Sequence, residues 1–275
     1  MVSYLCEVNG TPMKRLLLLA LATLLLTQAR AQLLLTESLT NRVDTTRRIQ
    51  GNIAPEVGFR SEKENVFNLK NTANLNILVG RQRALTVINK IEISTYGRQV
   101  NVSAGFVHAE FRNLIRPNVE FYPFAQSQWA GSRGLIVRAA VGVQSRFRLV
   151  HTEMFDVTAG VGVFYEYERW NYAGAVVPVE PGLPALNVHS GKAQFFAGFR
   201  FFITDKWSLV ASGYYQGKMN RRFVRPRWAY GVDLRYQIDH RFGLWGSYHF
   251  FYDAQPPVPI RKGYTMLSAG ASISF

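Results

Sequence analysis

Long segments with a two-residue period constrain this chain more than any other feature. In the final thirteen residues, Gly263 to Phe275, the odd-numbered positions after Gly263 are mostly apolar, and the even-numbered positions are mostly small or polar. Successive side chains of a β-strand point to opposite faces of a sheet, whereas a helix sorts residues with a period near 3.6. The pattern therefore predicts a strand with one apolar face and one mostly polar face.

The same alternation recurs through most of the chain after residue 46. Turn residues and charge clusters separate segments at about 47–61, 65–80, 83–96, 99–113, 117–130, 134–149, 153–170, 189–203, 206–218, 226–238, 241–253 and 263–275. Most of these are far longer than the five or six residues of an average globular strand, and they suit a tilted bilayer-spanning strand of roughly nine to eleven residues plus overhangs. The sequence therefore predicts an all-β fold, a transmembrane antiparallel up-and-down β-barrel of about 12 strands.

One segment shows how the two faces are expected to divide. In residues 134–149, the set Leu135, Val137, Ala139, Val141, Val143 and Phe147 alternates with Arg138, Gly142, Gln144, Arg146 and Arg148. We expect the first set to face lipid and the second to face the interior of the barrel.

The connections between the predicted strands differ in length. Those at 171–188, 217–226 and 254–263 are long, whereas those at 150–153, 204–205 and 239–240 are tight. Bacterial outer-membrane barrels have short periplasmic turns and longer outer loops. The second half of the chain follows this rule, and the first half has short connections at both ends.

Aromatic residues on the lipid-facing positions gather near the strand ends. They are Trp129, Tyr165, Tyr167 and Trp228 at the predicted outer ends, and Trp207, Phe242 and Phe275 at the predicted periplasmic ends. Tyr and Trp concentrate at membrane–water interfaces, so two girdles are expected. A lipid-facing last strand that ends in Phe275 also predicts recognition by the barrel insertion machinery.

The beginning of the chain predicts export. Lys14 and Arg15 precede an apolar run, Leu16 to Leu26, and small residues follow up to Ala31. This is the pattern of a secretory signal peptide, and the run is too short to cross a hydrocarbon core of about 30 Å. We expect a signal peptide at 1–31, with 1–12 as a mis-assigned extension before Met13, a periplasmic tail at 32–46, and the barrel at 47–275. The expected location is the bacterial outer membrane.

Composition limits the partners and the chemistry. The formal net charge is +14, which for an exported chain favours outer-membrane lipids with anionic headgroups over nucleic acid. A dedicated anionic ligand is the alternative. The one cysteine, Cys6, lies in the doubtful extension, so neither disulfides nor a thiolate metal site is expected.

Residues 101–171 resemble a known family. The segments AGFVHAEFR, EFYPFAQSQW, GVQSRFRL and GVGVFYEYE carry the likeness. They resemble the YdiY-like family of outer-membrane proteins, whose function is unknown and which are often labelled salt-induced. The resemblance implies an outer-membrane barrel, and it implies no catalytic residues.

The interior positions carry many charges. The predicted lumen network is Arg138, Arg146, Arg148, Asp156, Glu166, Glu168, Arg200, Asp233 and Arg235. Because buried charges are costly without partners, we expect cross-strand ion pairs, for instance between the Arg146 and Arg148 end of one strand and Asp156 on the next.

These interior charges are open to two interpretations. Inward positions also hold Tyr122, Phe124, Phe164, Phe196 and Phe202, and these rings favour a plugged barrel over a narrow polar path for a small solute. The expected role is therefore structural or the passage of a small solute.

Evidence for catalysis is weak. Ser247 and His249 share the predicted lumen side, which is the wrong side for attack on membrane lipid, and neither metal-ligand spacing nor a phosphate-binding loop occurs. We expect no enzyme activity, cofactor or metal. An outer-membrane lipid hydrolase or acyltransferase and a soluble periplasmic ligand-binding barrel remain as alternatives.

Overall fold

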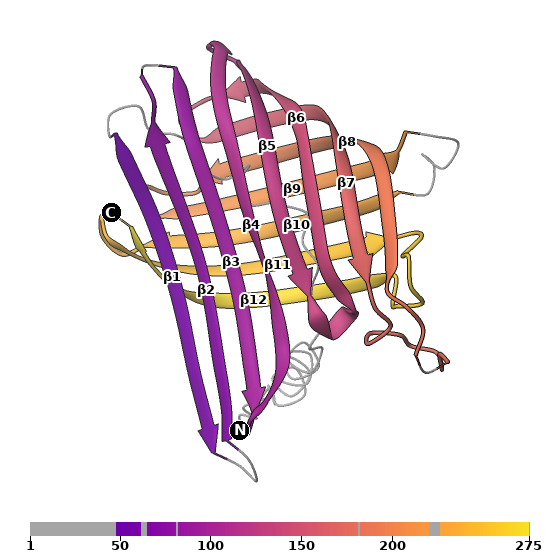
Figure 1. The fold of residues 1–275 in the computed structure, drawn as a ribbon. Helices are drawn as coiled ribbons and strands as arrows, with labels where there is room; N and C mark the ends of the chain where they lie inside the picture. Colours follow the sequence, from indigo (N-terminus) through magenta and orange to yellow (C-terminus); the bar gives the residue numbers. More distant parts are fainter. Residues whose placement is uncertain (1–47, 62–64, 81, 181, 220–225, 275) are drawn as a thin grey trace, which may run out of the picture.

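The computed structural model describes residues 48–274, apart from 62–64, 81, 181 and 220–225. In this range the chain forms one closed antiparallel barrel in which each strand pairs with its neighbours in sequence and β1 pairs with β12 (Figure 1). The strands are β1 (Ile49–Ser61), β2 (Asn65–Leu78), β3 (Arg83–Tyr96), β4 (Gln99–Arg116), β5 (Val119–Ala130), β6 (Leu135–His151), β7 (Phe155–Trp170), β8 (Leu186–Phe202), β9 (Trp207–Lys218), β10 (Arg227–Gln237), β11 (Phe242–Asp253) and β12 (Gly263–Ser274). A short 3₁₀ turn, η2 (Gly131–Arg133), joins β5 to β6.

This architecture confirms the predicted fold class and strand number. The largest shifts in strand ends are at β4, which continues to Arg116 instead of ending at 113, and at β8, which begins at Leu186 instead of 189. The signal peptide and tail predicted at 1–46 lie outside the described residues. Among the residues that the structure describes, no helix is long and apolar enough to cross a bilayer.

The two faces of the sheet have opposite character. On β7, Val161 and Val163 point outward and are 44% and 46% exposed, whereas Phe164 and Glu166 point inward and are buried. A water-soluble barrel would bury its valines and expose its carboxylates. This barrel shows the reverse.

Leu135 is an exception to the predicted alternation. It was expected on the lipid-facing side, but it is fully buried against Trp170, Val258 and Ile260. The pairing of β6 with β7 shifts between Leu135 and Val137, and a one-residue irregularity of this kind turns the next side chain to the other face.

The two ends of the barrel differ. The turn end carries the connections 79–82, 117–118, 152–154, 203–206 and 238–241, and the loop end carries the longer ones at 171–185 and 254–262. The tight turn between β10 and β11 is fixed by Asp239, whose Oδ1 accepts hydrogen bonds from the backbone N–H groups of Arg241 (2.7 Å) and Phe242 (2.8 Å). Both bonds lower the pKa of the Asp239 carboxyl, and the bond from Phe242 has the larger effect.

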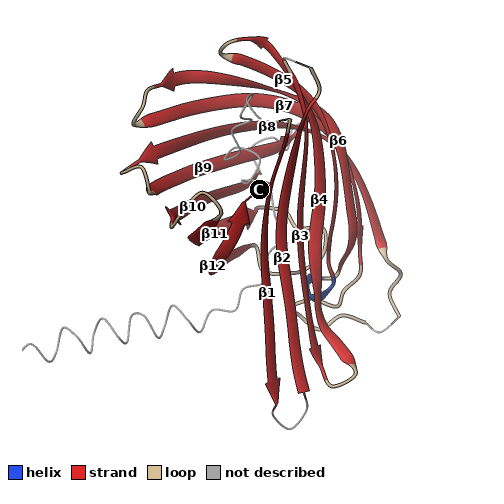
Figure 2. Ribbon diagram, turned by 90° about the vertical axis from the view of Figure 1, so that its left-hand side faces the viewer, coloured by secondary structure: helices blue, strands red, loops and turns tan. Residues whose placement is uncertain are grey.

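The barrel closes through a short seam. β1 and β12 pair at only two positions among the described residues, Asn52 with Ser274 and Ile53 with Ile273. The Asn52 Nδ2 group donates hydrogen bonds to the Ile273 carbonyl (3.2 Å) and to Ser274 Oγ (3.0 Å). Towards the loop end the two strands diverge, as Figures 1 and 2 both show.

Candidate functional site in the barrel interior

The half of the interior near the loop end holds a buried set of ion pairs, which we call the loop-end ion cluster. Its members are Arg138 on β6, Glu166 and Glu168 on β7, Lys192 on β8, Arg227 on β10 and Asp253 on β11. Three cations meet three carboxylates, so the cluster is electrically neutral at pH 7.

The contacts within the loop-end ion cluster connect strands that are not neighbours. Arg138 Nε donates to Glu168 Oε1 (2.6 Å), and Lys192 pairs with Glu166. Arg227 Nη1 lies 3.2 Å from Glu166 Oε2, and its Nη2 lies 3.0 Å from Glu168 Oε1, although β8 and β9 separate β10 from β7. Arg227 therefore reaches across the curved wall and ties two parts of the interior together.

A second polar cluster, the His108 cluster, lies on β4 and β5. Arg112 Nε donates to Glu110 Oε1 (2.5 Å), and His108 Nε2 lies 3.3 Å from Glu110 Oε2. The other ring nitrogen of His108 lies 3.3 Å from Gln126 Oε1. All of the charged groups in this cluster are buried and have partners, as desolvated charges require.

Arg146 extends this polar region towards the turn end. Its Nη1 lies 3.4 Å from Glu120 Oε2, and its guanidinium carbon lies 5.3 Å from the centre of the Tyr122 ring. Tyr122 in turn donates a hydrogen bond to Gln144 Oε1 (3.0 Å).

An apolar layer also occupies the interior. Ile88 of β3 and Phe106 of β4 belong to one buried cluster with Phe196, Tyr214, Ala229 and Phe251, which come from β8, β9, β10 and β11. β3 and β4 lie on the opposite side of the ring of strands from β8 to β11, so this packing spans the bore. The Phe124 ring contacts both His108 (5.5 Å between centroids) and Phe164 (6.1 Å).

The inward-facing aromatics predicted from the sequence all lie on the interior face. Tyr122, Phe124, Phe164 and Phe196 are buried, and Phe202 is half-buried near the turn end.

The wall formed by β1, β2 and β3 is accessible around Lys70, although Asn76, Thr86 and Ile88 on the same interior face are buried. Lys70 Nζ lies 3.5 Å from Glu56 Oε1 and 4.0 Å from Glu92 Oε1. The side chains of Lys70, Glu56 and Glu92 are 44%, 54% and 32% exposed. The bore is thus packed along β4 to β11 and accessible beside Lys70, Glu56 and Glu92 on the opposite wall.

The remaining predicted network residues lie near the turn end. Arg148 Nε is 3.9 Å from Asp156 Oδ1, as expected, but Arg146 pairs with Glu120 because those two residues are opposite each other in the β5–β6 register. Asp156 also contacts His151 (2.7 Å), its own register partner.

Three further predicted residues lie on the same interior parity. Arg200 stacks over Phe202 at 6.0 Å, and Asp233 lies 3.3 Å from His249 Nε2. Arg235 is exposed near the turn end of the barrel. Ser247 and His249 are both buried on this interior face.

The predicted interface aromatics point outward. Near the loop end, Trp129 donates to Ser103 Oγ (3.2 Å), the Tyr165 hydroxyl bonds to His189 Nδ1 (2.7 Å), Tyr167 donates to Asn187 Oδ1 (3.0 Å), and Trp228 contacts the Phe250 and Tyr252 rings. Near the turn end, the Trp207 and Tyr236 rings pack at a tilt with 4.7 Å between centroids, and Phe242 is exposed. Phe275 lies outside the described residues.

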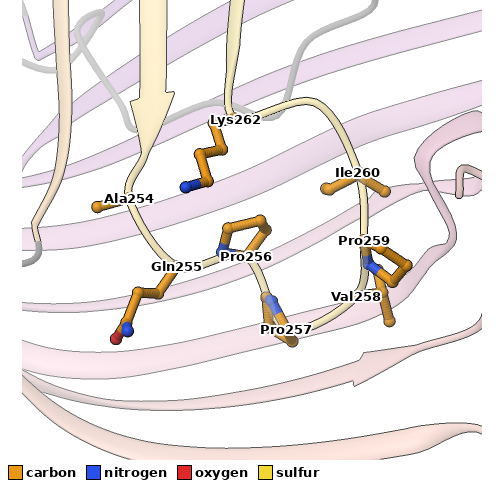
Figure 3. Close-up of a pocket in the computed structure, with 8 residues that line it drawn as sticks. All are labelled: Ala254, Gln255, Pro256, Pro257, Val258, Pro259, Ile260 and Lys262. Carbon is orange, nitrogen blue, oxygen red and sulfur yellow. The ribbon is translucent and has the colours of Figure 1, made fainter. Parts of the chain in front are cut away.

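The loop between β11 and β12 covers part of the loop end. Val258 and Ile260 are buried against Ala130, Leu135 and Trp170, and the Val176 backbone N–H donates to the Pro259 carbonyl (2.9 Å). This loop borders a hollow of about 690 Å³ lined by residues 254–260 and Lys262 (Figure 3).

Sequence reasoning missed several members of these clusters, namely His108, Glu110, Arg112, Lys192 and Arg227. Each shares the parity of inward residues on its own strand, so the rule of alternation could have found them. Their pairing partners follow from the barrel's register and curvature, which the rule does not supply. Within the described residues, no group of three or more His, Cys, Asp or Glu side chains is placed to hold a metal ion.

Comparison with known proteins gives structural likenesses only. No family model matches the chain, including any for the YdiY-like family, and no curated protein matches it. Among solved structures, the NanC porin matches with a TM-score of 0.42 and 10% identity, covering 82% of this chain and 96% of that one. The translocator domain of the autotransporter NalP from Neisseria meningitidis matches with a TM-score of 0.49 and 11% identity, covering 82% of this chain and 87% of that one. The KdgM porin in complex with disordered oligogalacturonate matches with a TM-score of 0.44 and 8% identity, covering 82% of this chain and 99% of that one.

Proposed function

We propose that this chain is a bacterial outer-membrane β-barrel, exported by a signal peptide and resident in the lipid bilayer. The observation that carries the proposal is the inverted distribution of side chains. Outward residues such as Val141 (58% exposed) and Leu267 (56% exposed) form an apolar exterior, whereas ion pairs fill the interior. An apolar surface of this extent suits hydrocarbon and disfavours water.

The first candidate function is a structural role for a barrel whose interior is plugged. The loop-end ion cluster, the apolar layer and the His108 cluster all fill the bore along β4 to β11. Breaking such a set of buried ion pairs is strongly unfavourable, so the plug is expected to be permanent.

Slow passage of a small polar solute is the second candidate, favoured by the accessible wall of β1 to β3. Lys70, Glu56 and Glu92 offer both signs of charge along that wall. We also propose a relationship to the YdiY-like family, which residues 101–171 resemble.

Planar-bilayer conductance of the refolded protein tests these candidates. The plugged barrel predicts a silent trace, and the slow passage predicts small discrete openings whose ion selectivity shifts in Lys70→Glu. The matched control is Lys206→Glu, in an exposed turn. Large, stable openings in the unmodified protein would contradict both candidates.

Two partners follow from this location. Exposed basic residues near the strand ends, including Arg169 and Arg241, support the proposal that the barrel binds anionic lipid headgroups. The barrel insertion machinery would recognise the last strand through Phe275, and deletion of Phe275 should slow assembly without changing the stability of barrels that have formed. Normal assembly kinetics after the deletion would contradict the second partner.

We propose no enzyme activity. Ser247 and His249 are buried on the interior face of the barrel, away from the lipid-facing exterior on which a hydrolase of membrane esters would present its nucleophile. Phospholipid hydrolysis by the purified protein that is lost in both Ser247→Ala and His249→Ala would overturn this proposal. Release of the protein from membranes by carbonate washing would instead favour a soluble periplasmic barrel.

A further inference from the structure

The seam between β1 and β12 leaves two strand edges without ladder partners. Beyond Asn52 and Ile53, the edge of β1 from Ala54 to Phe59 pairs with no described residue of β12. The edge of β12 from Ser272 back to Thr265 likewise faces no described residue of β1. Backbone N–H and C=O groups need hydrogen-bond partners inside a membrane, where an unsatisfied group costs several kcal/mol.

The apolar layer of the bore reaches this seam. Tyr264 and Met266 on β12 are partly buried against the layer and face the interior. Phe251 of β11 stacks on Tyr264, with 5.0 Å between ring centroids. Phe251 is buried, and the Arg133 guanidinium carbon lies 4.1 Å from the centre of the Tyr264 ring, so Met266 and the edge of Tyr264 form the apolar surface on this side of the seam.

The other side of the seam is polar. The inward face of β1 and β2 carries Asn52, Glu56, Asn68, Lys70 and Asn74. Lys70 lies between the carboxylates of Glu56 and Glu92, and all three remain accessible. This side offers a cation for a phosphate group and carboxylates for an ammonium group.

We propose that the seam is a lateral binding site for one zwitterionic phospholipid of the surrounding membrane. The acyl chain lies against Met266 and the accessible edge of Tyr264, and the headgroup reaches Lys70, Glu56 and Glu92. Entry is lateral because the packed interior blocks the axial route along β4 to β11. The headgroup and the water it carries also hydrogen-bond to backbone groups of the strand edges that have no ladder partner, which a purely hydrocarbon ligand cannot do. The inference rests on the proposed membrane location.

Disulfide mapping tests whether the seam is open. Continuing the register of Asn52 with Ser274 would place Gly58 opposite Ser268 if the seam were fully closed. In phospholipid bilayers, with Cys6 replaced by Ser, the control pair Asn52→Cys/Ser274→Cys should oxidise readily. The pair Gly58→Cys/Ser268→Cys should stay reduced. Equal oxidation of both pairs within one chain would mean a closed seam and would overturn the proposal, as would a Gly58–Ser268 disulfide between two copies, because a second chain would then fill the seam.

Quenching by a zwitterionic phospholipid brominated on its acyl chains tests occupancy. Two single-tryptophan proteins are compared, one keeping outward-facing Trp207 and one keeping Trp245, which faces the interior and donates to the Ala271 carbonyl (3.2 Å). Both should lose fluorescence, and the loss at Trp245 should disappear when Gly58→Cys/Ser268→Cys is oxidised in detergent before reconstitution. Unquenched Trp245 beside quenched Trp207 overturns the lipid site, whereas unquenched Trp207 overturns the membrane location itself.

The headgroup contact has its own test. Lys70→Met should reduce the quenching of Trp245 and leave that of Trp207 unchanged. The control Lys90→Met alters a neighbouring interior lysine outside the proposed headgroup contacts and should change neither. Identical quenching in the two lysine variants would contradict the assigned headgroup contact, and the disulfide map stands as an independent measurement if a variant does not refold.

Discussion

At the scale of single residues, the packed part of the interior depends on buried charges that lie in ion pairs. Glu168 illustrates this because it accepts contacts from Arg138 and Arg227 and also from the Trp170 indole N–H (3.3 Å). The two arginines come from different parts of the wall, so one carboxylate bridges both.

Replacing Glu168 by Gln should therefore lower the free energy of unfolding by about 3–5 kcal/mol, because two buried cations lose a shared counter-charge. Urea unfolding of the refolded barrel in lipid measures the change. Glu180→Gln, in the exposed connection between β7 and β8, is the control and should have little effect. Equal midpoints for the two variants would mean that the cluster is not desolvated.

Close packing between neighbouring strands on the interior face makes a second residue critical. A Cβ on Gly160 would lie 2.1 Å from Phe196 Cζ and 2.5 Å from the Ser145 carbonyl oxygen, whereas a Cβ on Gly246 would meet nothing within 4 Å. Gly160→Ala should cost about 1–3 kcal/mol through overpacking, and Gly246→Ala should be nearly neutral. Thermal unfolding compares the two, and an unchanged midpoint for Gly160→Ala would argue against a packed interior.

At the scale of strands and turns, short connections depend on specific capping bonds. In the β10–β11 turn, the bonds from the Phe242 and Arg241 backbone N–H groups to Asp239 hold the carboxyl in its ionised form and so lower its pKa. A depressed pKa contributes stability above the unfolded-state value, and this contribution is lost as the pH falls through the folded-state pKa.

Asp239→Ala should consequently destabilise the barrel at neutral pH. The difference from the unmodified protein should shrink as the pH is lowered through and below about 3.9, the ordinary pKa of an aspartate. Unfolding measured at a series of pH values checks this, and His240→Ala, in the same turn, is the control. A difference that is constant with pH would show that Asp239 acts through shape and not through charge.

The elements also show what the sequence could predict. Alternation placed Arg138, Glu168 and Phe164 on the interior because a two-residue period fixes the face of a strand. It could not find that Arg227 meets Glu166, because that contact depends on how strands separated in sequence curve towards each other. It also misplaced Leu135, where a local shift in register reverses the faces.

At the scale of the whole molecule, the account depends on which medium touches each surface. Val161 lies near the middle of β7 on the outward face, and Thr72 lies near the middle of β2 on the interior wall, opposite Ala54 and Lys90 in the register. Gly160, although it also faces the interior, is unsuitable for comparison because its site is already filled by Phe196.

The free energy of unfolding of Val161→Arg and Thr72→Arg in lipid bilayers tests this claim most directly. A charge on the lipid face near the bilayer middle should cost about 2–4 kcal/mol, whereas the same charge on the accessible interior wall should cost much less. Equal losses for the two variants, or a larger loss for Thr72→Arg, would contradict a barrel with lipid outside and a polar interior.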